Sequence, residues 1–115
     1  MQRRYLQLDV FSERAGQGNP LAVVVDTDGL DTPAMQAIAA WLNLSETVFF
    51  VPADEGASYH VRIFTPKQEL PFAGHPSVGA AWAAVALELC AAGDDRLLVQ
   101  QCGAGKLPVR VVGSR

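Results

Sequence analysis

A carboxylate with catalytic potential stands at Glu46, between Ser45 and Thr47 and directly before the very apolar segment Val48 to Val51. Carboxylates act as general acids or bases when apolar surroundings favour their protonated form, so a buried strand end would suit Glu46 for proton transfer. The same residue could instead be a solvated turn residue, as most glutamates are. Spacing alone leaves both interpretations open.

A second polar group, Gly74-His75-Pro76-Ser77, precedes the apolar segment Val78 to Leu89. Proline suits a first helical turn and Gly74 permits close approach to the backbone, so this helix start can bind a carboxylate or a phosphate. His75 can exchange protons near neutral pH, or it can close the loop by donating to a backbone carbonyl. Ser77 can cap the helix or contact a ligand, and its type favours capping.

The elements that must position these residues form a mixed α and β pattern. Asp31 or Thr32 can cap a helix with Pro33 in its first turn, and Asn43 is a plausible stop. The segment 78–89 carries no charge before position 88 and is apolar on every helical face, so we expect a central helix that the rest of the domain wraps. Alternation and apolar runs predict about six strands: Tyr5 to Phe11, Leu21 to Val25, Val48 to Val51, Tyr59 to Phe64, Leu97 to Val99 and Leu107 to Val112.

Composition excludes several classes of function. The net charge of −3 comes from 12 acidic and 9 basic residues with no basic cluster, which disfavours a nucleic-acid partner. No stretch is long and apolar enough for a membrane span and the first ten residues lack a signal-like core, so we expect a cytoplasmic protein. Cys90 and Cys102 have no metal-ligand spacing and are expected to be ordinary reduced thiols. The mean hydropathy of +0.15 is high for 115 residues, so part of the surface is expected to meet a partner.

Five segments, taken in order, resemble the first half of proteins of the PhzF-like (phenazine biosynthesis-like) family. Any one of them would be weak evidence, but five in the right order are specific, and the resemblance covers essentially the whole chain, residues 1–115. The segments are Asp9-Val10-Phe11, Gly18-Asn19-Pro20-Leu21-Ala22-Val23, Ser45-Glu46-Thr47, Arg62-Ile63-Phe64-Thr65-Pro66 and Glu69-Leu70-Pro71-Phe72-Ala73-Gly74-His75-Pro76.

The resemblance implies an α+β fold, with a mixed β-sheet wrapped around a central apolar helix, as one half of a diaminopimelate epimerase-like two-domain fold. It implies that Glu46 moves a proton on the substrate, and that His75 and the backbone of Gly74 face substrate groups across a cleft. Related epimerases use a cysteine pair, whereas this chain has Ala73-Gly74-His75 at the corresponding loop, which disfavours cysteine-based racemisation. By itself, Glu69 is expected to be a surface charge.

These observations predict an isomerase that works on a small carboxylate-bearing substrate without metal or organic cofactor. Glu46 is the expected catalytic residue, and Gly74, His75 and Ser77 are the expected substrate-binding residues. The family's second domain is absent from this chain, so we expect a homodimer or a complementary second half-domain to complete the cleft. A non-catalytic binding or assembly module, or a degenerate fragment that folds poorly, remain the alternatives.

Overall fold

The computed structural model of the chain describes residues 3–10, 19–89 and 97–110. Cys90, Phe11 and the last two residues of the final expected strand lie outside this part. Two helices and seven strands follow one another along the chain: β1 (Tyr5–Val10), β2 (Asn19–Val24), α1 (Thr32–Leu42), β3 (Glu46–Val51), β4 (Tyr59–Phe64), β5 (Glu69–Leu70), α2 (Gly74–Ala86), β6 (Leu97–Cys102) and β7 (Gly105–Arg110).

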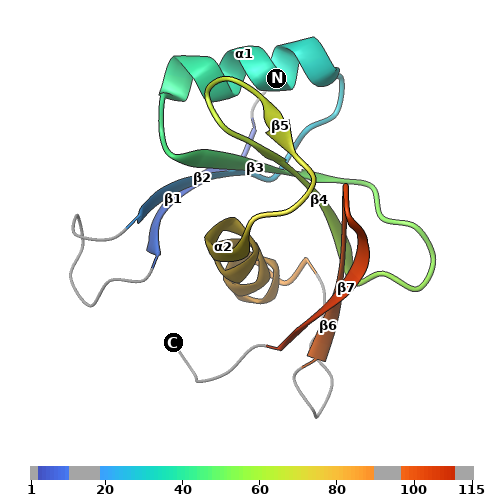
Figure 1. Cartoon of the computed structure of the whole chain (residues 1–115). Helices are drawn as coiled ribbons and strands as arrows, with labels where there is room; N and C mark the ends of the chain where they lie inside the picture. The colour runs from blue at the N-terminus through green and yellow to red at the C-terminus, as the bar shows by residue number, and fades with distance from the viewer. Residues whose placement is uncertain (1–2, 11–18, 90–96, 111–115) are drawn as a thin grey trace.

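The strands form one mixed sheet in the order β1-β2-β3-β4-β6-β7, with β5 paired to one end of β4. The β2/β3 and β4/β6 pairs are parallel and the other pairs are antiparallel. Figure 1 looks nearly along α2 and shows the sheet curling around this helix, from β1 and β2 on one side to β6 and β7 on the other. The expected mixed sheet around a central helix is therefore present.

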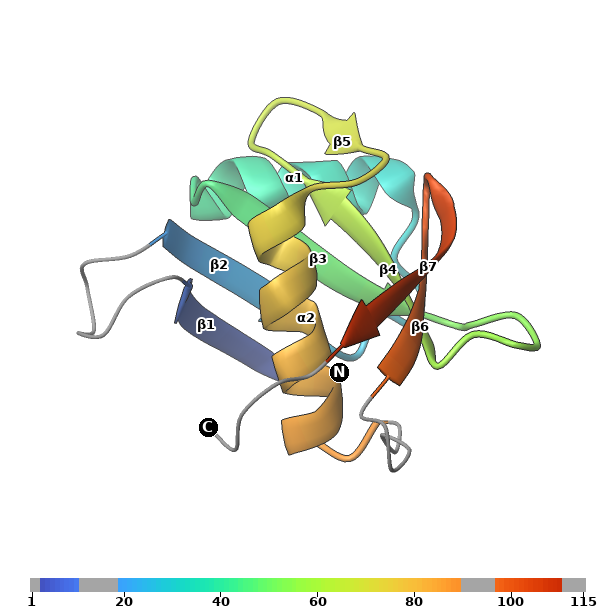
Figure 2. The ribbon, with the colours of Figure 1, turned by 60° about the horizontal axis from the view of Figure 1, so that its bottom comes forward.

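The main core lies between α2 and the concave face of the sheet. Small side chains of α2 meet inward residues of the sheet, and Figure 2 shows the helix lying across the strands. Each fully buried aliphatic or aromatic side chain in such a core contributes roughly 1.5–3 kcal/mol to stability. The buried members are Leu21, Val23, Val25, Val48, Phe50, Tyr59, Val61, Ile63, Ala80, Ala81, Ala83, Ala84, Leu98 and Cys102.

Helix α1 covers the opposite, convex face of the sheet. The expected capping is confirmed, because the Asp31 carboxylate accepts a hydrogen bond of 2.9 Å from the Ala34 amide at the helix start. Asn43 ends the helix in the left-handed conformation with φ of 55°, which Asn tolerates better than most residues. Met35 and Ala39 pack on Phe49 and Phe64, whose rings meet edge to face at 5.4 Å.

One expectation about the central helix was wrong. The helix begins at Gly74 and holds Pro76 in its first turn, as the Gly74-His75-Pro76-Ser77 motif indicated. It is not buried all round, however, since Val78 and Trp82, one turn apart, are 50% and 43% exposed. The sheet therefore wraps only part of the helix, and one apolar stripe stays open to solvent.

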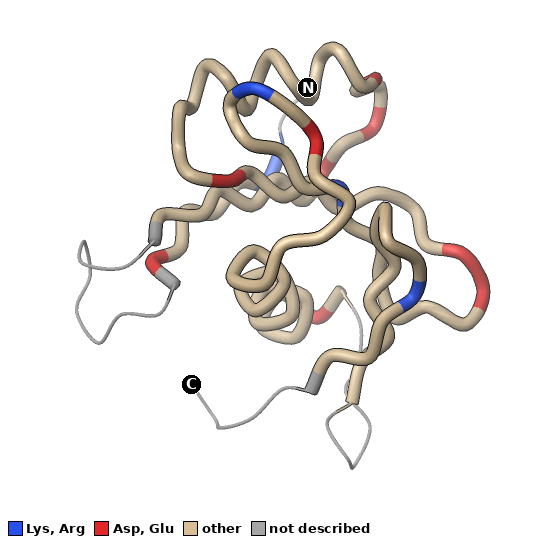
Figure 3. Tube along the Cα trace, in the orientation of Figure 1, with Lys and Arg blue, Asp and Glu red and all other residues tan. Residues whose placement is uncertain are grey.

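The charged residues lie around the periphery. In Figure 3, the basic and acidic positions of the described residues are scattered along the trace and form no basic stripe. Within these same residues, neither helix is long and apolar enough to cross a membrane.

Candidate active site

Glu46 is the first residue of β3, and its side chain points to the concave face of the sheet. Alternate residues of a strand share a face, and Val48 and Phe50 of the same strand belong to the core against α2. The Glu46 side chain is 15% exposed, so the strand end is largely buried. The solvated-turn alternative for Glu46 is therefore wrong.

His75 is the second residue of α2 and reaches across the core face to Glu46. Nε2 of His75 and Oε1 of Glu46 are in direct contact and form an ion pair whenever the imidazole is protonated. The imidazole is 20% exposed, so both groups are mostly shielded while one side stays accessible. The fold thus joins the two strongest sequence candidates, which lie 29 positions apart, into one carboxylate–imidazole pair.

Such a pair can hold and transfer a proton. Shielding from water strengthens the interaction between a carboxylate and an imidazole, and both are side chains that commonly transfer protons in enzymes. A carboxylate held in this way can take a proton from a bound molecule and return it at another atom. The geometry therefore suits general acid or base catalysis.

The helix start beside the pair is open to a ligand at Gly74. A Cβ placed on Gly74 would meet no heavy atom within 4 Å, so this backbone faces open space. The N-cap residue is Ala73, whose methyl group cannot accept hydrogen bonds from the first-turn amides. Uncapped amides at a helix start favour a carboxylate or another anion.

Ser77 does not cap the helix, so the expectation of capping was wrong. Its hydroxyl donates to the carbonyl of Ala73 at 2.8 Å and accepts from Nε2 of Gln100 at 2.9 Å. The residue is only 5% exposed. Ser77 thus acts inside the domain, on the geometry of the first turn, and its expected contact with substrate stays a prediction.

Glu69 is not an isolated surface charge. Its carboxylate accepts two hydrogen bonds from the Arg62 guanidinium, at 2.7 and 2.8 Å, which ties β5 to β4. Donating these hydrogen bonds to Glu69 raises the pKa of Arg62 above its usual value. Neither the Arg62–Glu69 pair nor the hydrogen bond between Gln100 and Ser77 was predicted from the sequence. Gln100 is a polar residue at an inward position of a strand, between Leu98 and Cys102, and this placement was the signal that could have indicated a buried hydrogen bond.

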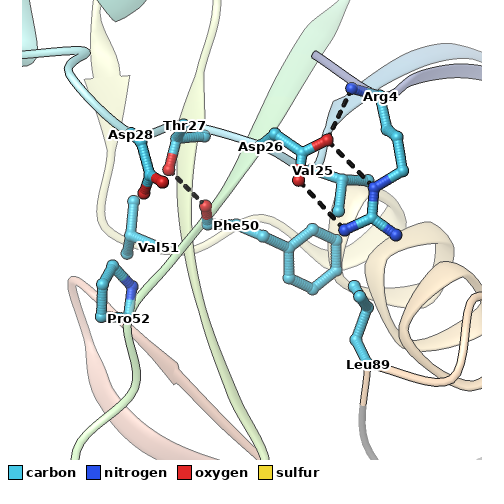
Figure 4. A pocket seen from close by; sticks show the side chains of 9 residues that line it. All are labelled: Arg4, Val25, Asp26, Thr27, Asp28, Phe50, Val51, Pro52 and Leu89. Carbon is cyan, nitrogen blue, oxygen red and sulfur yellow. Dashed lines mark hydrogen bonds and ion pairs between the residues drawn. The ribbon is translucent and has the colours of Figure 1, made fainter. Parts of the chain in front are cut away.

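A separate pocket of about 210 Å³ lies at the other end of the sheet. Figure 4 shows Thr27 donating to the carbonyl of Phe50 and Arg4 paired with Asp26 at this pocket. Phe50 lies near the far end of β3 from Glu46, and Leu89, which also lines the pocket, follows the far end of α2 from His75. The pocket is therefore distinct from the carboxylate–imidazole pair.

Known proteins are similar in sequence to most of this chain. Antisense-enhancing sequence 1 of Schizosaccharomyces pombe is 43% identical over 112 residues, which are 96% of this chain and 38% of the relative. Trans-2,3-dihydro-3-hydroxyanthranilate isomerase of Pseudomonas aeruginosa is 46% identical over 78 residues, which are 68% of this chain and 28% of the relative. The chain thus spans less than half the length of these relatives.

Solved structures match the fold closely. The phenazine biosynthesis protein of the PhzF family from Bacillus anthracis superposes with a TM-score of 0.85 at 31% identity, over 99% of this chain and 38% of that one. A hydroxyproline epimerase from Agrobacterium vitis superposes with a TM-score of 0.70 over 92% of this chain and 36% of that one, and at 13% identity this likeness shows the fold alone. The expected α+β class and the epimerase-like half-fold are confirmed. Residues 8–115 match the family of phenazine biosynthesis-like proteins, and the chain therefore belongs to this PhzC-PhzF family.

Proposed function

We propose that this chain supplies the proton-transfer half of an isomerase site that acts on a small carboxylate-bearing substrate. The contact between Glu46 and His75 is the observation that carries the proposal, because it places a shielded carboxylate beside an imidazole at an accessible helix start. A relative named for the isomerisation of trans-2,3-dihydro-3-hydroxyanthranilate supports this class of substrate, since that compound is a small carboxylate.

Glu46 is the general base and then the general acid in this proposal. Its carboxylate removes a proton from a carbon atom of the substrate, and the electrons of the broken C–H bond move into the adjoining π system. The proton then returns to another atom of the same molecule, so the reaction is balanced without an organic cofactor or metal. His75 holds the carboxylate in place, and the backbone of Gly74 at the helix start receives the substrate carboxylate.

A second half-domain, or a second copy of this chain, completes the cleft in this proposal. The side chains of Glu46 and His75 keep 15% and 20% of their surface exposed, which leaves room for a substrate to reach them. The chain covers only 38% of the Schizosaccharomyces relative. Phe72 in the loop before α2 is 45% exposed, and Val78 on the next turn of the helix is 50% exposed. Apolar side chains beside a polar site are typical of a surface that meets a partner.

Deuterium incorporation into candidate small acids tests the catalytic role. We expect incorporation by the chain, alone or mixed with a second half-domain from a relative, and its loss in Glu46→Gln. Glu55→Gln is the matched control, because it makes the same change in an exposed loop. Analytical ultracentrifugation of the same samples identifies the complete unit as a dimer or a mixed complex.

Two results would contradict the proposal. Incorporation that persists in Glu46→Gln would remove Glu46 from the chemistry. Binding of a small carboxylate by a well-folded chain, with no exchange in any assembly, would favour the alternative of a non-catalytic binding module.

A further inference from the structure

A chain of buried polar side chains runs behind the helix start. The Tyr59 hydroxyl of β4 donates to Oε1 of Gln100 at 3.1 Å, and Nε2 of Gln100 donates to the Ser77 hydroxyl at 2.9 Å. Tyr59 is 4% exposed and Gln100 is 0% exposed. Three elements distant in sequence, β4, β6 and α2, are thus joined by side-chain hydrogen bonds inside an otherwise apolar core.

An amide at this position has a cost that apolar residues would avoid. Burying an amide without partners costs roughly 2–7 kcal/mol, and even a fully bonded amide gains little over a well-packed apolar side chain. Gln100 occupies the inward position between Leu98 and Cys102 of β6, in a core that is otherwise apolar. Both ends of its amide are bonded to buried hydroxyl groups, so Gln100 constrains the orientation of Tyr59 and Ser77.

The hydrogen bonds of Gln100 bear on the orientation of the first turn of α2, which carries Gly74 and His75. The Ser77 hydroxyl bonded to Gln100 also donates to the carbonyl of Ala73 at 2.8 Å. Residues 73 and 77 flank the glycine and the histidine on both sides. Holding both flanks limits the rotation of the first turn about the helix axis and so fixes where the imidazole points.

The same strand holds the preceding loop at a second point. After Cys102 the chain turns at Gly103 and Ala104, and the Ala104 amide donates to the carbonyl of Pro71 at 3.0 Å. A Cβ on Gly103 would lie 2.8 Å from Cα of Pro71, so the two backbones are in close contact. Strand β6 and its turn therefore contact the site loop before the helix and within its first turn.

We propose that Gln100 is a positioning residue, which acts through Ser77 to orient His75 toward Glu46 and is itself oriented by Tyr59. This inference rests on the proposed function, because it assigns a purpose to the orientation of the carboxylate–imidazole pair. Gln100 is 0% exposed and touches no substrate in this role.

The imidazole resonances of the ¹⁵N-labelled chain provide a direct test. The chain has two histidines, and His60, whose Nδ1 lies 3.2 Å from the carbonyl of Pro52, is an internal reference away from the pair. At fixed pH, the shift that Glu46→Gln causes in the ring nitrogens of His75 measures their contact. This shift is measured in five backgrounds, as double-mutant cycles: the unchanged chain, Gln100→Met, Ser77→Ala, Tyr59→Phe and the control Gln101→Met.

We expect the shift to be present in the unchanged chain and to shrink toward zero in Gln100→Met and Ser77→Ala. Tyr59→Phe removes one hydroxyl and should have a smaller effect in the same direction. Gln101→Met should retain the full shift, because Gln101 bonds with Asp54 outside the core and Met gives the same isosteric change. In the complete assembly, turnover should fall roughly 10- to 100-fold in Gln100→Met, mostly in kcat, as expected for a misplaced group.

The outcomes separate this inference from the proposed function. A His75 that does not respond to Glu46→Gln in the unchanged chain overturns the pair and the function built on it. A full response that survives in Gln100→Met, Ser77→Ala and Tyr59→Phe overturns the positioning role alone. If the His60 signals show that Gln100→Met is unfolded, the other two variants decide the matter.

Discussion

Arg62 of β4 holds Glu69 of β5 through two parallel hydrogen bonds, Nε to Oε2 at 2.8 Å and Nη2 to Oε1 at 2.7 Å. The guanidinium also lies over the ring of Phe64, 5.5 Å from its centre. Strand β5 is only two residues long and leads into the loop before Gly74 and His75. The forked pair therefore anchors the chain shortly before the site.

Arg62→Lys should reduce activity more than stability. Lysine keeps the charge but cannot form the two-pronged contact, and an ion pair at this exposure contributes about 1 kcal/mol or less. The loop to His75 would lose its anchor, so we expect a several-fold loss of deuterium incorporation with little change in the urea midpoint. Arg4→Lys is the matched control, because Arg4 forms a similar forked pair with Asp26 at the far end of the sheet. Equal effects of the two variants on incorporation would contradict the anchoring role.

Gly103→Ala should destabilise the chain by about 1–3 kcal/mol, as overpacking commonly does. The added methyl would lie 2.8 Å from Cα of Pro71, and a backbone atom cannot move aside cheaply. Urea denaturation followed by circular dichroism measures the loss. Gly74→Ala is the stability control, since a Cβ there meets open space. A Gly103→Ala chain as stable as the unchanged one would show that the turn does not press on Pro71.

Asp31→Ala should cost about 1 kcal/mol of unfolding free energy, because the Ala34 amide would lose its cap. Asp31→Asn keeps an acceptor oxygen and should retain most of the stability. Thermal and urea unfolding of the three chains provide the comparison. Equal losses in Asp31→Ala and Asp31→Asn would assign the effect to charge at the helix start and not to the hydrogen bond.

The sequence was sufficient to predict both helices and six strands, but not the two-residue strand β5 or the contacts between the elements. Asp31, Pro33 and Asn43 bound α1 through local chemistry, which is why that helix was predicted well. Glu46 and His75 came from motifs, whereas their contact depends on β3 and α2 packing across the core. Gln100 lies 23 positions from Ser77 and 41 from Tyr59, so no local pattern could reveal its bonds. The exposure of Val78 and Trp82 was missed because an all-apolar helix does not show which face the sheet leaves open.

Acid should weaken the Arg4–Asp26 pair. Hydrogen bonds from Arg4 hold the pKa of Asp26 below its ordinary 3.8. A carboxyl whose pKa is lowered by folding stabilises the native state above its unfolded pKa, and this contribution is lost as the pH falls through the folded pKa. Asp26→Asn should therefore lose less stability than the unchanged chain on acidification below about pH 4.

The effect of Asp26→Asn should be small, because both side chains are exposed to solvent. Urea midpoints across the acid range measure it, and the difference should shrink in about 1 M salt, where surface charges are screened. Identical acid sensitivity of the two chains at low salt would show that the pair adds nothing to stability.

The buried face of α2 consists of very small side chains, among them Gly79, Ala80, Ala83 and Ala84. Such residues let a helix axis approach a sheet closely, so the spacing between the two layers is set by single methyl groups. Because Glu46 belongs to the sheet and His75 to the helix, that spacing also influences how closely their side chains can approach. One added methylene group on the buried face of α2 would push the helix away from the sheet and so increase the separation of the two layers. A substitution on this buried face can therefore change the contact between Glu46 and His75 without touching either residue.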